Sequence, residues 1–225
     1  MSSPNVPFEL LQSCHLARVV SVQDPDQLAR VKVKMLVLDG DGEAEIWARV
    51  AVPFAGSGRG ALFIPDVDDE VLVMFVGGDP RFPIVIGGLW NGADAPPDQF
   101  AGDRVDRWLI KGKNGTVISI VEESASSAKV HFETPNGVKG TFTDESGGSI
   151  KFEDTAGNSI TIDSQGISLQ ASAKVKVQAG QVEISAGMVK VDAGMSKFSG
   201  VVKCDVLQAT TVVASTYTPG AGNIW

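Results

Sequence analysis

Apolar and polar residues alternate through the second half of the chain, most regularly between Gly166 and Gly200. This segment divides into five lines of seven residues, GISLQAS, AKVKVQA, GQVEISA, GMVKVDA and GMSKFSG, each headed by glycine or alanine. Within the lines, apolar residues stand two apart, as Val182 and Ile184 do. Residues two apart share one face of a strand, whereas a coiled coil needs spacings of three and four. The pattern therefore predicts short strands, each ended by a small residue that lets the backbone turn.

Such short strands need neighbours to bury their apolar face. A single-chain solenoid usually spends roughly 20 or more residues on each coil, whereas seven residues supply one strand and one corner. The repeat length favours several identical chains wound together, most simply three. An antiparallel meander with tight turns remains open as an alternative.

The residues that would face inward in such a needle follow from the alternation. Their neighbours, such as Lys151, Thr161, Ser168, Lys176, Glu183 and Lys190, should face water. Between residues 147 and 200 the lines shorten from ten residues to nine and then seven, which predicts a narrowing needle. The predicted inward residues are Ile150, Phe152, Ile160, Ile162, Ile167, Leu169, Val175, Val177, Val182, Ile184, Val189 and Val191.

The first half of the chain shows alternation without a repeat. Five apolar stretches, at 17–22, 30–36, 46–52, 71–76 and 83–89, are separated by segments rich in Asp, Gly and Pro. Five strands with uneven loops are typical of an OB-type Greek-key barrel. We therefore predict an all-β protein with an N-terminal segment at 1–15, a barrel at 16–92, a Pro- and Gly-rich linker at 93–107 and a needle at 108–225. The start of the needle, 108–146, should be less regular, with wide and partly antiparallel sheets.

Composition narrows the possible functions. The chain has 225 residues, a formal charge of −8 and a pI near 4.8, so binding to nucleic-acid phosphates has no general electrostatic support. The sequence contains no run of eighteen apolar residues, so no transmembrane helix is predicted. The first residues lack the basic start of a secretory signal, and we expect assembly in the cytoplasm.

The reactive side chains are few and scattered. Cys14 and Cys204 fall in different predicted modules and are expected to be free thiols, and His15 and His131 are isolated. No spacing suggests a zinc site. We therefore expect no metal and no cofactor.

Three short segments resemble chemical sites without completing one. The glycine loop at 56–60 is followed by an apolar run ending in proline, where a nucleotide-binding loop would be followed by a helix. The acidic segment 39–43 lacks the glutamate that ends a calcium loop and fits a hairpin turn. The acidic turn 66–70 has no catalytic partner, and Arg49 or Arg59 could pair with it. No enzymatic activity is predicted.

Two blocks of the barrel region match a known family. WARVAVPFAGSGRGALFIPDVDDEVLVMF at 47–75 and GGDPRFPIVIGGLWNG at 77–92 resemble the OB domain of phage baseplate spikes. This family includes the baseplate assembly protein V group, the VgrG proteins of type VI secretion and the spikes of extracellular contractile injection systems. The likeness rests on the order and spacing of several motifs and covers about a third of the chain in detail.

The resemblance implies a homotrimer. Three barrels would form a collar, and three tails would wind into a triple-stranded β-helix, which favours the three-chain closure over the meander. The implied function is that of a central spike that nucleates a baseplate, caps the inner tube and pierces the target envelope. Its partners would be separate hub and inner-tube proteins, it would meet a membrane only transiently during puncture, and it would belong to a phage tail or extracellular injection particle.

The C-terminal end would then carry a tip. Some family members close their own tip around a metal held by histidines, but no histidine follows His131. After Gly200 the repeat is expected to degrade, and about residues 215–225 are expected to form a platform for a separate PAAR-type tip protein. The platform residues are Tyr217, Pro219, Ile224 and Trp225.

Two other functions are weighed against the spike. A trimeric β-helical tailspike that binds or cleaves polysaccharide would need an exposed groove of aromatic and carboxylate side chains, and the needle lines contain few aromatics. An OB-fold nucleic-acid binder would need clustered basic and aromatic residues, and none is evident.

Overall fold

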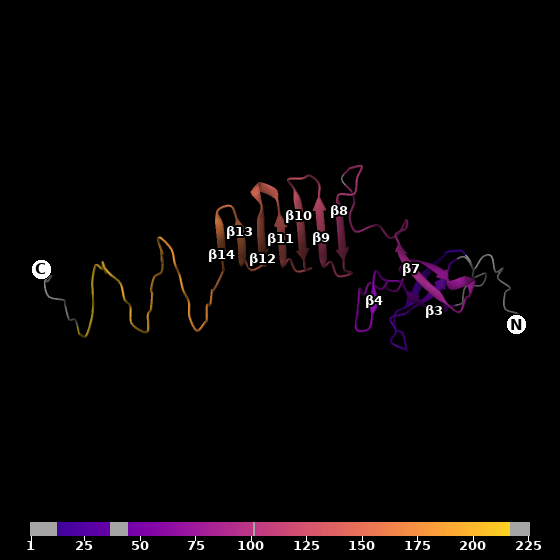
Figure 1. Cartoon of the computed structure of the whole chain (residues 1–225), viewed down its shortest axis with the longest axis horizontal. Coiled ribbons are helices and arrows are strands. Elements are labelled where there is room, and N and C mark those ends of the chain that lie inside the picture. Colours follow the sequence, from indigo (N-terminus) through magenta and orange to yellow (C-terminus); the bar gives the residue numbers. More distant parts are fainter. Residues whose placement is uncertain (1–12, 37–44, 101, 217–225) are drawn as a thin grey trace. The chain divides into compact units, whose positions relative to one another are not determined.

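The computed structural model describes residues 13–36, 45–100 and 102–216. It is all-β, as predicted, and divides into two units, Met1–Lys174 and Val175–Trp225. The first unit contains a closed barrel and a seven-stranded sheet. Figure 1 labels β3 and β7 of the barrel and all seven strands of the sheet. The domain boundaries at 16–92, 93–107 and 108–225 stay predictions.

The barrel closes in the order β1-β2-β3-β7-β6, which confirms the OB-type prediction. Its strands are β1 (His15–Ser21), β2 (Val31–Met35), β3 (Glu45–Val50), β6 (Glu70–Phe75) and β7 (Pro83–Leu89). The strands pair antiparallel except β3 with β7, which run parallel and close the barrel.

Alternate residues of these strands fill the barrel. On β2 the apolar residues are buried and the lysines between them are half-buried. Val19, Val31, Val33, Val71, Val73 and Val85 are the largest fully buried side chains. One chain thus supplies the complete core of this part.

The glycine loop forms a hairpin, and no helix follows it. Strands β4 (Ala55–Gly56) and β5 (Arg59–Gly60) pair across Gly58, whose φ of 66° lies in the left-handed region that glycine tolerates. The loop therefore lacks the helix that a nucleotide-binding loop requires. The short 3-10 helices η1 (Val76–Gly78) and η2 (Glu145–Gly147) lie elsewhere, in turns.

The stem, which we define as strands β8 to β14, is a sheet in which every strand pairs with its neighbour in sequence. All six pairings are antiparallel and without a register shift. The antiparallel pairing expected for the start of the needle is therefore present throughout the sheet, and the expected irregularity is not. The line that begins at Gly166 also pairs within its own chain, with β13. The strands are β8 (Arg107–Lys111), β9 (Val117–Glu122), β10 (Ala128–Glu133), β11 (Lys139–Thr143), β12 (Ser149–Glu153), β13 (Ser159–Asp163) and β14 (Gly166–Gln170).

Ion pairs hold the predicted linker to the first strand of the stem. Arg107 lies 3.0 Å from Asp98, 2.9 Å from the carboxylate of Asp106 and 2.9 Å from Glu123. Arg104 donates a hydrogen bond of 2.6 Å to the carbonyl oxygen of Glu123. These contacts fix the place where the antiparallel meander begins.

The tail, defined here as residues 171–216, contains no strand paired within the chain. Its backbone runs back and forth in successive passes, drawn from orange to yellow in Figure 1, and bends at Gly180, Gly187 and Gly194. None of these three glycines has a positive φ, although Gly166 does, at 128°. The backbone thus bends at the predicted small residues, without the left-handed conformation that only glycine readily adopts.

Candidate functional site: the uncovered apolar face of the stem

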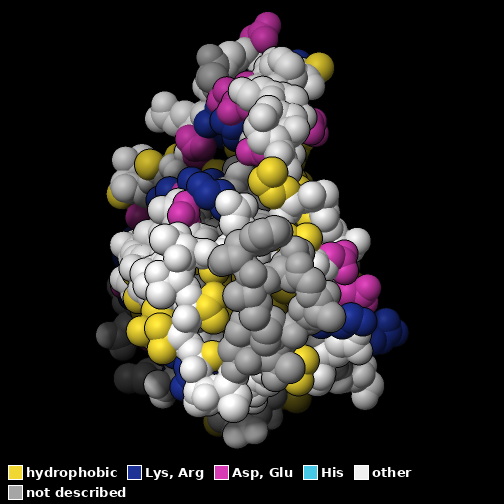
Figure 2. Space-filling view, turned by 90° about the vertical axis from the view of Figure 1, so that its left-hand side faces the viewer, with side chains coloured by type: hydrophobic (Ala, Val, Ile, Leu, Met, Phe, Trp, Pro, Cys, Tyr) yellow, Lys and Arg dark blue, Asp and Glu magenta, His cyan; other side chains and the backbone are white. Residues whose placement is uncertain are grey.

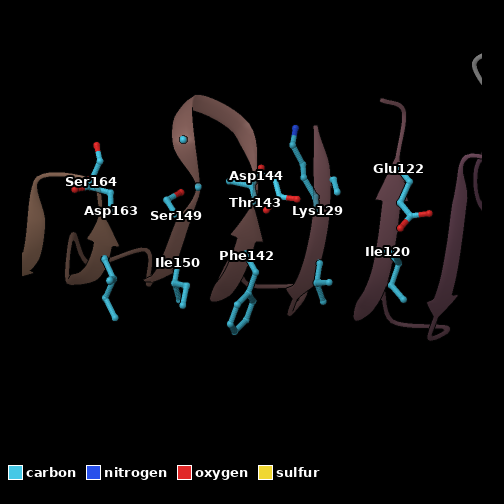
Figure 3. Close-up of a pocket in the computed structure, with 15 residues that line it drawn as sticks. Ile120, Glu122, Lys129, Phe142, Thr143, Asp144, Ser149, Ile150, Asp163 and Ser164 are labelled. Carbon is cyan, nitrogen blue, oxygen red and sulfur yellow. The ribbon is translucent and has the colours of Figure 1, made fainter. Parts of the chain in front are cut away.

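Two rows of apolar side chains cross the stem on one face. Because facing residues of antiparallel strands share a side of the sheet, the register assigns each row directly. Figure 3 shows Ile120, Phe142 and Ile150 lying in one row across neighbouring strands. The first row is Trp108, Ile120, Val130, Phe142, Ile150, Ile162 and Ile167, and the second is Ile110, Ile118, Phe132, Gly140, Phe152, Ile160 and Leu169.

Aromatic rings pack against one another at the middle of this face. The ring centroids of Phe132 and Phe152 lie 6.0 Å apart, and Phe142 meets Phe152 edge-on at 6.0 Å. Gly140 makes room for this cluster, since a Cβ atom there would lie 2.2 Å from the Phe132 ring. Glycine is needed here because a ring covers the backbone.

The face is uncovered in a single chain. Ile118 is 56% exposed and Ile167 is 77% exposed. On β9 the burial pattern is inverted, because Ser119 is buried while both isoleucines beside it are exposed. A hollow of about 580 Å³ opens beside Ile120, Phe142 and Ile150, and Figure 2 shows hydrophobic side chains uncovered on the surface of the chain.

The opposite face has its polar groups paired. His131 Nδ1 lies 2.9 Å from the hydroxyl of Thr141, and Lys139 lies 3.2 Å from Glu153. Lys151 also pairs with Glu153, and these two lysines hold the pKa of the Glu153 carboxyl below its usual range. Polar side chains satisfied in this way can face water, whereas the apolar rows need a covering surface.

The predicted inward residues fall into two groups. Ile150, Phe152, Ile160, Ile162, Ile167 and Leu169 lie together on the apolar face, with Lys151, Thr161 and Ser168 paired on the other side. Val175, Val177, Val182, Ile184, Val189 and Val191 lie in the tail and are exposed. Their place in a trimer core stays a prediction.

The first half of the apolar face was not among the predicted inward residues. Trp108, Ile110, Ile118, Ile120, Val130, Phe132 and Phe142 occupy it on β8 to β11. The same spacing of two, as in Ile118 and Ile120, could have identified most of them. Phe142 lacks such a partner because Gly140 stands at that position.

The remaining predicted sites resolve as follows. In the acidic turn, Asp66 lies 2.5 Å from Lys113, which lowers the pKa of its carboxyl. Neither Arg49 nor Arg59 forms an ion pair within the described ranges, so the predicted pairing with them is wrong. Two predicted sites lie outside the described residues. They are the acidic segment 39–43 and the platform residues Tyr217, Pro219, Ile224 and Trp225.

Other chemical groups remain dispersed in the part of the chain that the structure describes. Cys14 and Cys204 are free and exposed. No cluster of metal-binding side chains occurs among residues 13–36, 45–100 and 102–216. The same residues include no helix long and apolar enough to span a membrane.

The barrel has a buried core of its own, whereas the stem has one polar face and one uncovered apolar face. This combination is typical of a protein that assembles through its stem. Two family models agree with this division. The OB domain of type VI secretion and phage-baseplate injectors matches residues 15–90, and the C-terminal trimerisation domain of phage baseplate V matches residues 129–194. The chain belongs to the phage baseplate V and VgrG-like spike family.

Several curated relatives are spike proteins of type VI secretion. The spike protein VgrG4b of Pseudomonas aeruginosa is 45% identical over 58 residues, which are 26% of this chain and 7% of the relative. VgrG1b of the same species is 33% identical over 101 residues, 42% of this chain and 14% of the relative. The actin cross-linking toxin VgrG1 of Vibrio cholerae is 35% identical over 75 residues, 32% of this chain and 7% of the relative. Each alignment thus covers a small part of a longer relative.

Proposed function

We propose that this protein is the homotrimeric central spike of a contractile injection system or phage-tail baseplate. The observation that carries the proposal is the uncovered apolar face, which lies largely within the segment matched by a trimerisation domain. Three copies of one sheet can close into a three-sided prism with the apolar rows inside and the paired polar face outside. This arrangement satisfies both faces with a single sequence.

The energy of such a closure is large. A fully buried Ile, Val or Phe side chain contributes roughly 1.5–3 kcal/mol relative to an exposed one, and each copy would bury both rows. The predicted inward residues of the tail, Val175 to Val191, would add to this sum. The needle is therefore expected to be very stable and slow to dissociate.

The remaining parts of the proposal concern partners. The barrels form a collar on a separate hub protein and cap the inner tube, and the needle pierces the envelope of the target cell on contraction. A tip protein of the PAAR type sits on the C-terminal platform. The relatives' names as spike proteins support this role, which is mechanical and needs no catalytic residue or cofactor.

The polysaccharide-binding alternative has less support. Every tryptophan and phenylalanine of the stem strands, namely Trp108, Phe132, Phe142 and Phe152, lies on the apolar face. Sugar rings commonly need an aromatic surface open to solvent, and a closed prism would cover these rings. Release of sugars from bacterial glycans by the purified trimer would favour the alternative.

The test places a carboxylate inside or outside the proposed needle. Val182→Asp would bring three carboxylates close to one axis, at a cost of several kcal/mol per unpaired buried charge, and should abolish the trimer in native mass measurement. Lys176→Asp adds the same group at a position expected to face water and should leave the trimer intact. A trimer of unchanged mass and stability for Val182→Asp would contradict the inward assignment.

A separate experiment tests the tip. Removal of residues 217–225 should leave the trimer intact and abolish co-purification of a PAAR-type tip protein expressed together with it. Unaltered binding of the tip protein would overturn the platform.

A further inference from the structure

The bends of the tail continue beyond the glycine lines, with a shorter spacing. They are seven residues apart up to Gly194, then six to Gly200, and then five. The seven-residue repeat thus ends near Gly200, as expected, but regular bends continue beyond it with a shorter period. The successive bends lie at Ala173, Gly180, Gly187, Gly194, Gly200, Asp205, Thr210 and Ser215.

We call the residues from one bend to the next a pass. In every pass, the second and fourth residues after the bend are two apart and therefore lie on the same side of an extended backbone. No charged residue occupies any of these positions. The pairs are Val175/Val177, Val182/Ile184, Val189/Val191, Ser196/Phe198, Val202/Cys204, Leu207/Ala209 and Val212/Ala214.

All charged residues of the tail occupy the other face. Each is the first, third or fifth residue after a bend, and one of them, Asp205, is itself the next bend. The rule holds for the seven-residue passes and the five-residue passes alike. These residues are Lys174, Lys176, Glu183, Lys190, Asp192, Lys197, Lys203 and Asp205.

Exposure within the single chain follows the same division. Val202 and Val212 are 62% and 60% exposed, against 97% for Val201 and 94% for Val213. Val182 and Val189, on the predicted inward side of the longer passes, have similar values of 60% and 58%. Leu207, at 74% against 84% for Val206, follows the same order, so after Gly200 the second residue after each bend is less exposed than the valine beside it.

We propose that residues 201–215 continue the three-chain needle as a thinner section, with Val202/Cys204, Leu207/Ala209 and Val212/Ala214 facing its axis. At about 3.3 Å per residue, shortening a pass from seven residues to five removes roughly 7 Å from each side of the prism. A narrower prism has less room inside. The inward pairs change accordingly, from two large residues in the seven-residue passes to one large and one small residue in the five-residue passes.

The occupant of this face is two further copies of the same chain. The section continues directly from the segment matched by the trimerisation domain, which ends at residue 194, and it keeps the same inward positions. The inference rests on the proposed homotrimer and extends its interface to Ser215. It also assigns Cys204 to the axis and Lys203 to the outer surface.

The chain carries a natural probe of this assignment at Cys204. In full-length protein with Cys14→Ser, the reduced thiol of Cys204 is labelled with a maleimide, and the same reaction is run on the variant that also carries Cys204→Ser and Lys203→Cys. If Cys204 faces the axis, labelling requires local opening of the needle and should be more than about 100-fold slower than at position 203. Both thiols should react fully in denaturant.

Native mass of the same samples separates the two proposals. A trimer in which Cys204 reacts as fast as position 203 would overturn the thin section and leave the spike proposal standing. A monomer would overturn both. As a second measurement, Ala209→Asp should lower the melting temperature of the trimer and Gln208→Asp should not, and equal effects of the two would also overturn the inward assignment.

Discussion

The barrel and the stem use the same strand alternation and reach opposite degrees of completion. In the barrel, β1 pairs with both β2 and β6, so the sheet closes on itself and Val19, Val33 and Val73 are fully buried. In the stem, β8 and β14 are the two ends of an open sheet, and isoleucines such as Ile110 remain 53% exposed. Closure therefore decides whether one chain can cover its own apolar face.

This difference predicts that the two parts unfold in different ways. The barrel should unfold within each chain, independently of protein concentration. The stem should lose its structure together with the trimer, so its apparent stability should rise with concentration by mass action. Substitutions of similar chemistry in the two parts can test this distinction.

The largest effect is expected from Phe152→Ala in the stem. Phe152 contacts both Phe132 and Phe142 at ring separations of 6.0 Å, and the proposed prism would bury all three copies. Loss of a buried phenylalanine side chain costs about 3–5 kcal/mol in each chain. Thermal unfolding at low and high protein concentration should show a trimer that melts earlier, with a stronger dependence on concentration.

Phe75→Ala is the matched change in the barrel. Phe75 is 5% exposed and lies 5.6 Å from the ring of His15, so a similar loss of about 3–5 kcal/mol is expected. Here the shift should be the same at every concentration, and the native mass should remain that of a trimer. If Phe152→Ala also gave a shift independent of concentration, the comparison between the two parts would be wrong.

Local alternation explains which parts of this fold the sequence could predict. The spacing of two assigned the barrel strands and one face for Ile160, Ile162 and their neighbours, because side-chain direction on a strand depends on the adjacent residues alone. The strand partners were less accessible. For example, β14 pairs with β13 of its own chain. The residues of one strand alone do not show which strand lies beside it.

Two other differences between the prediction and the structure have separate causes, one a distant contact and one a bend without glycine. Asp66 pairs with Lys113, and nothing near the acidic turn in the sequence indicates that lysine. The tail bends at Asp205 and Thr210 without glycine, so a search for glycine heads ended the repeat at Gly200. The five-residue period becomes visible once the bends themselves are known.

A smaller effect is expected where a side chain covers the backbone of the stem. Gly140→Ala would place a Cβ atom 2.2 Å from the Phe132 ring, and overpacking of this kind typically costs about 1–3 kcal/mol. The melting temperature of the trimer should fall while that of the barrel is unchanged. Gly87→Ala is the control, since its Cβ atom would have no neighbour within 4 Å. Equal shifts from the two substitutions would show that the ring over Gly140 does not matter.

The smallest effect concerns a charged group in the barrel and sharpens the comparison through pH. Arg30 donates to Asp24 at 2.6 Å and 3.1 Å, and the backbone N–H groups of Asp26, Leu28 and Arg30 also donate to its carboxylate. The Arg30 guanidinium, with these N–H groups, holds the pKa of the Asp24 carboxyl well below its usual range.

A carboxyl whose pKa is lower in the folded state stabilises that state above its unfolded pKa of about 3.9 and loses this contribution as pH falls through the folded value. Asp24→Asn should therefore lower the melting temperature of the barrel at neutral pH, and its difference from the unaltered protein should shrink below about pH 4. Asp26→Asn is the control, because the Asp26 side chain is 64% exposed and makes one bond to Arg30, at 2.6 Å, so its effect should be smaller at every pH. The stem transition should respond to neither change, since Asp24 and Arg30 lie in the barrel. A difference for Asp24→Asn that stayed constant down to low pH would mean that the carboxylate charge contributes nothing and that its shape alone holds the loop between β1 and β2.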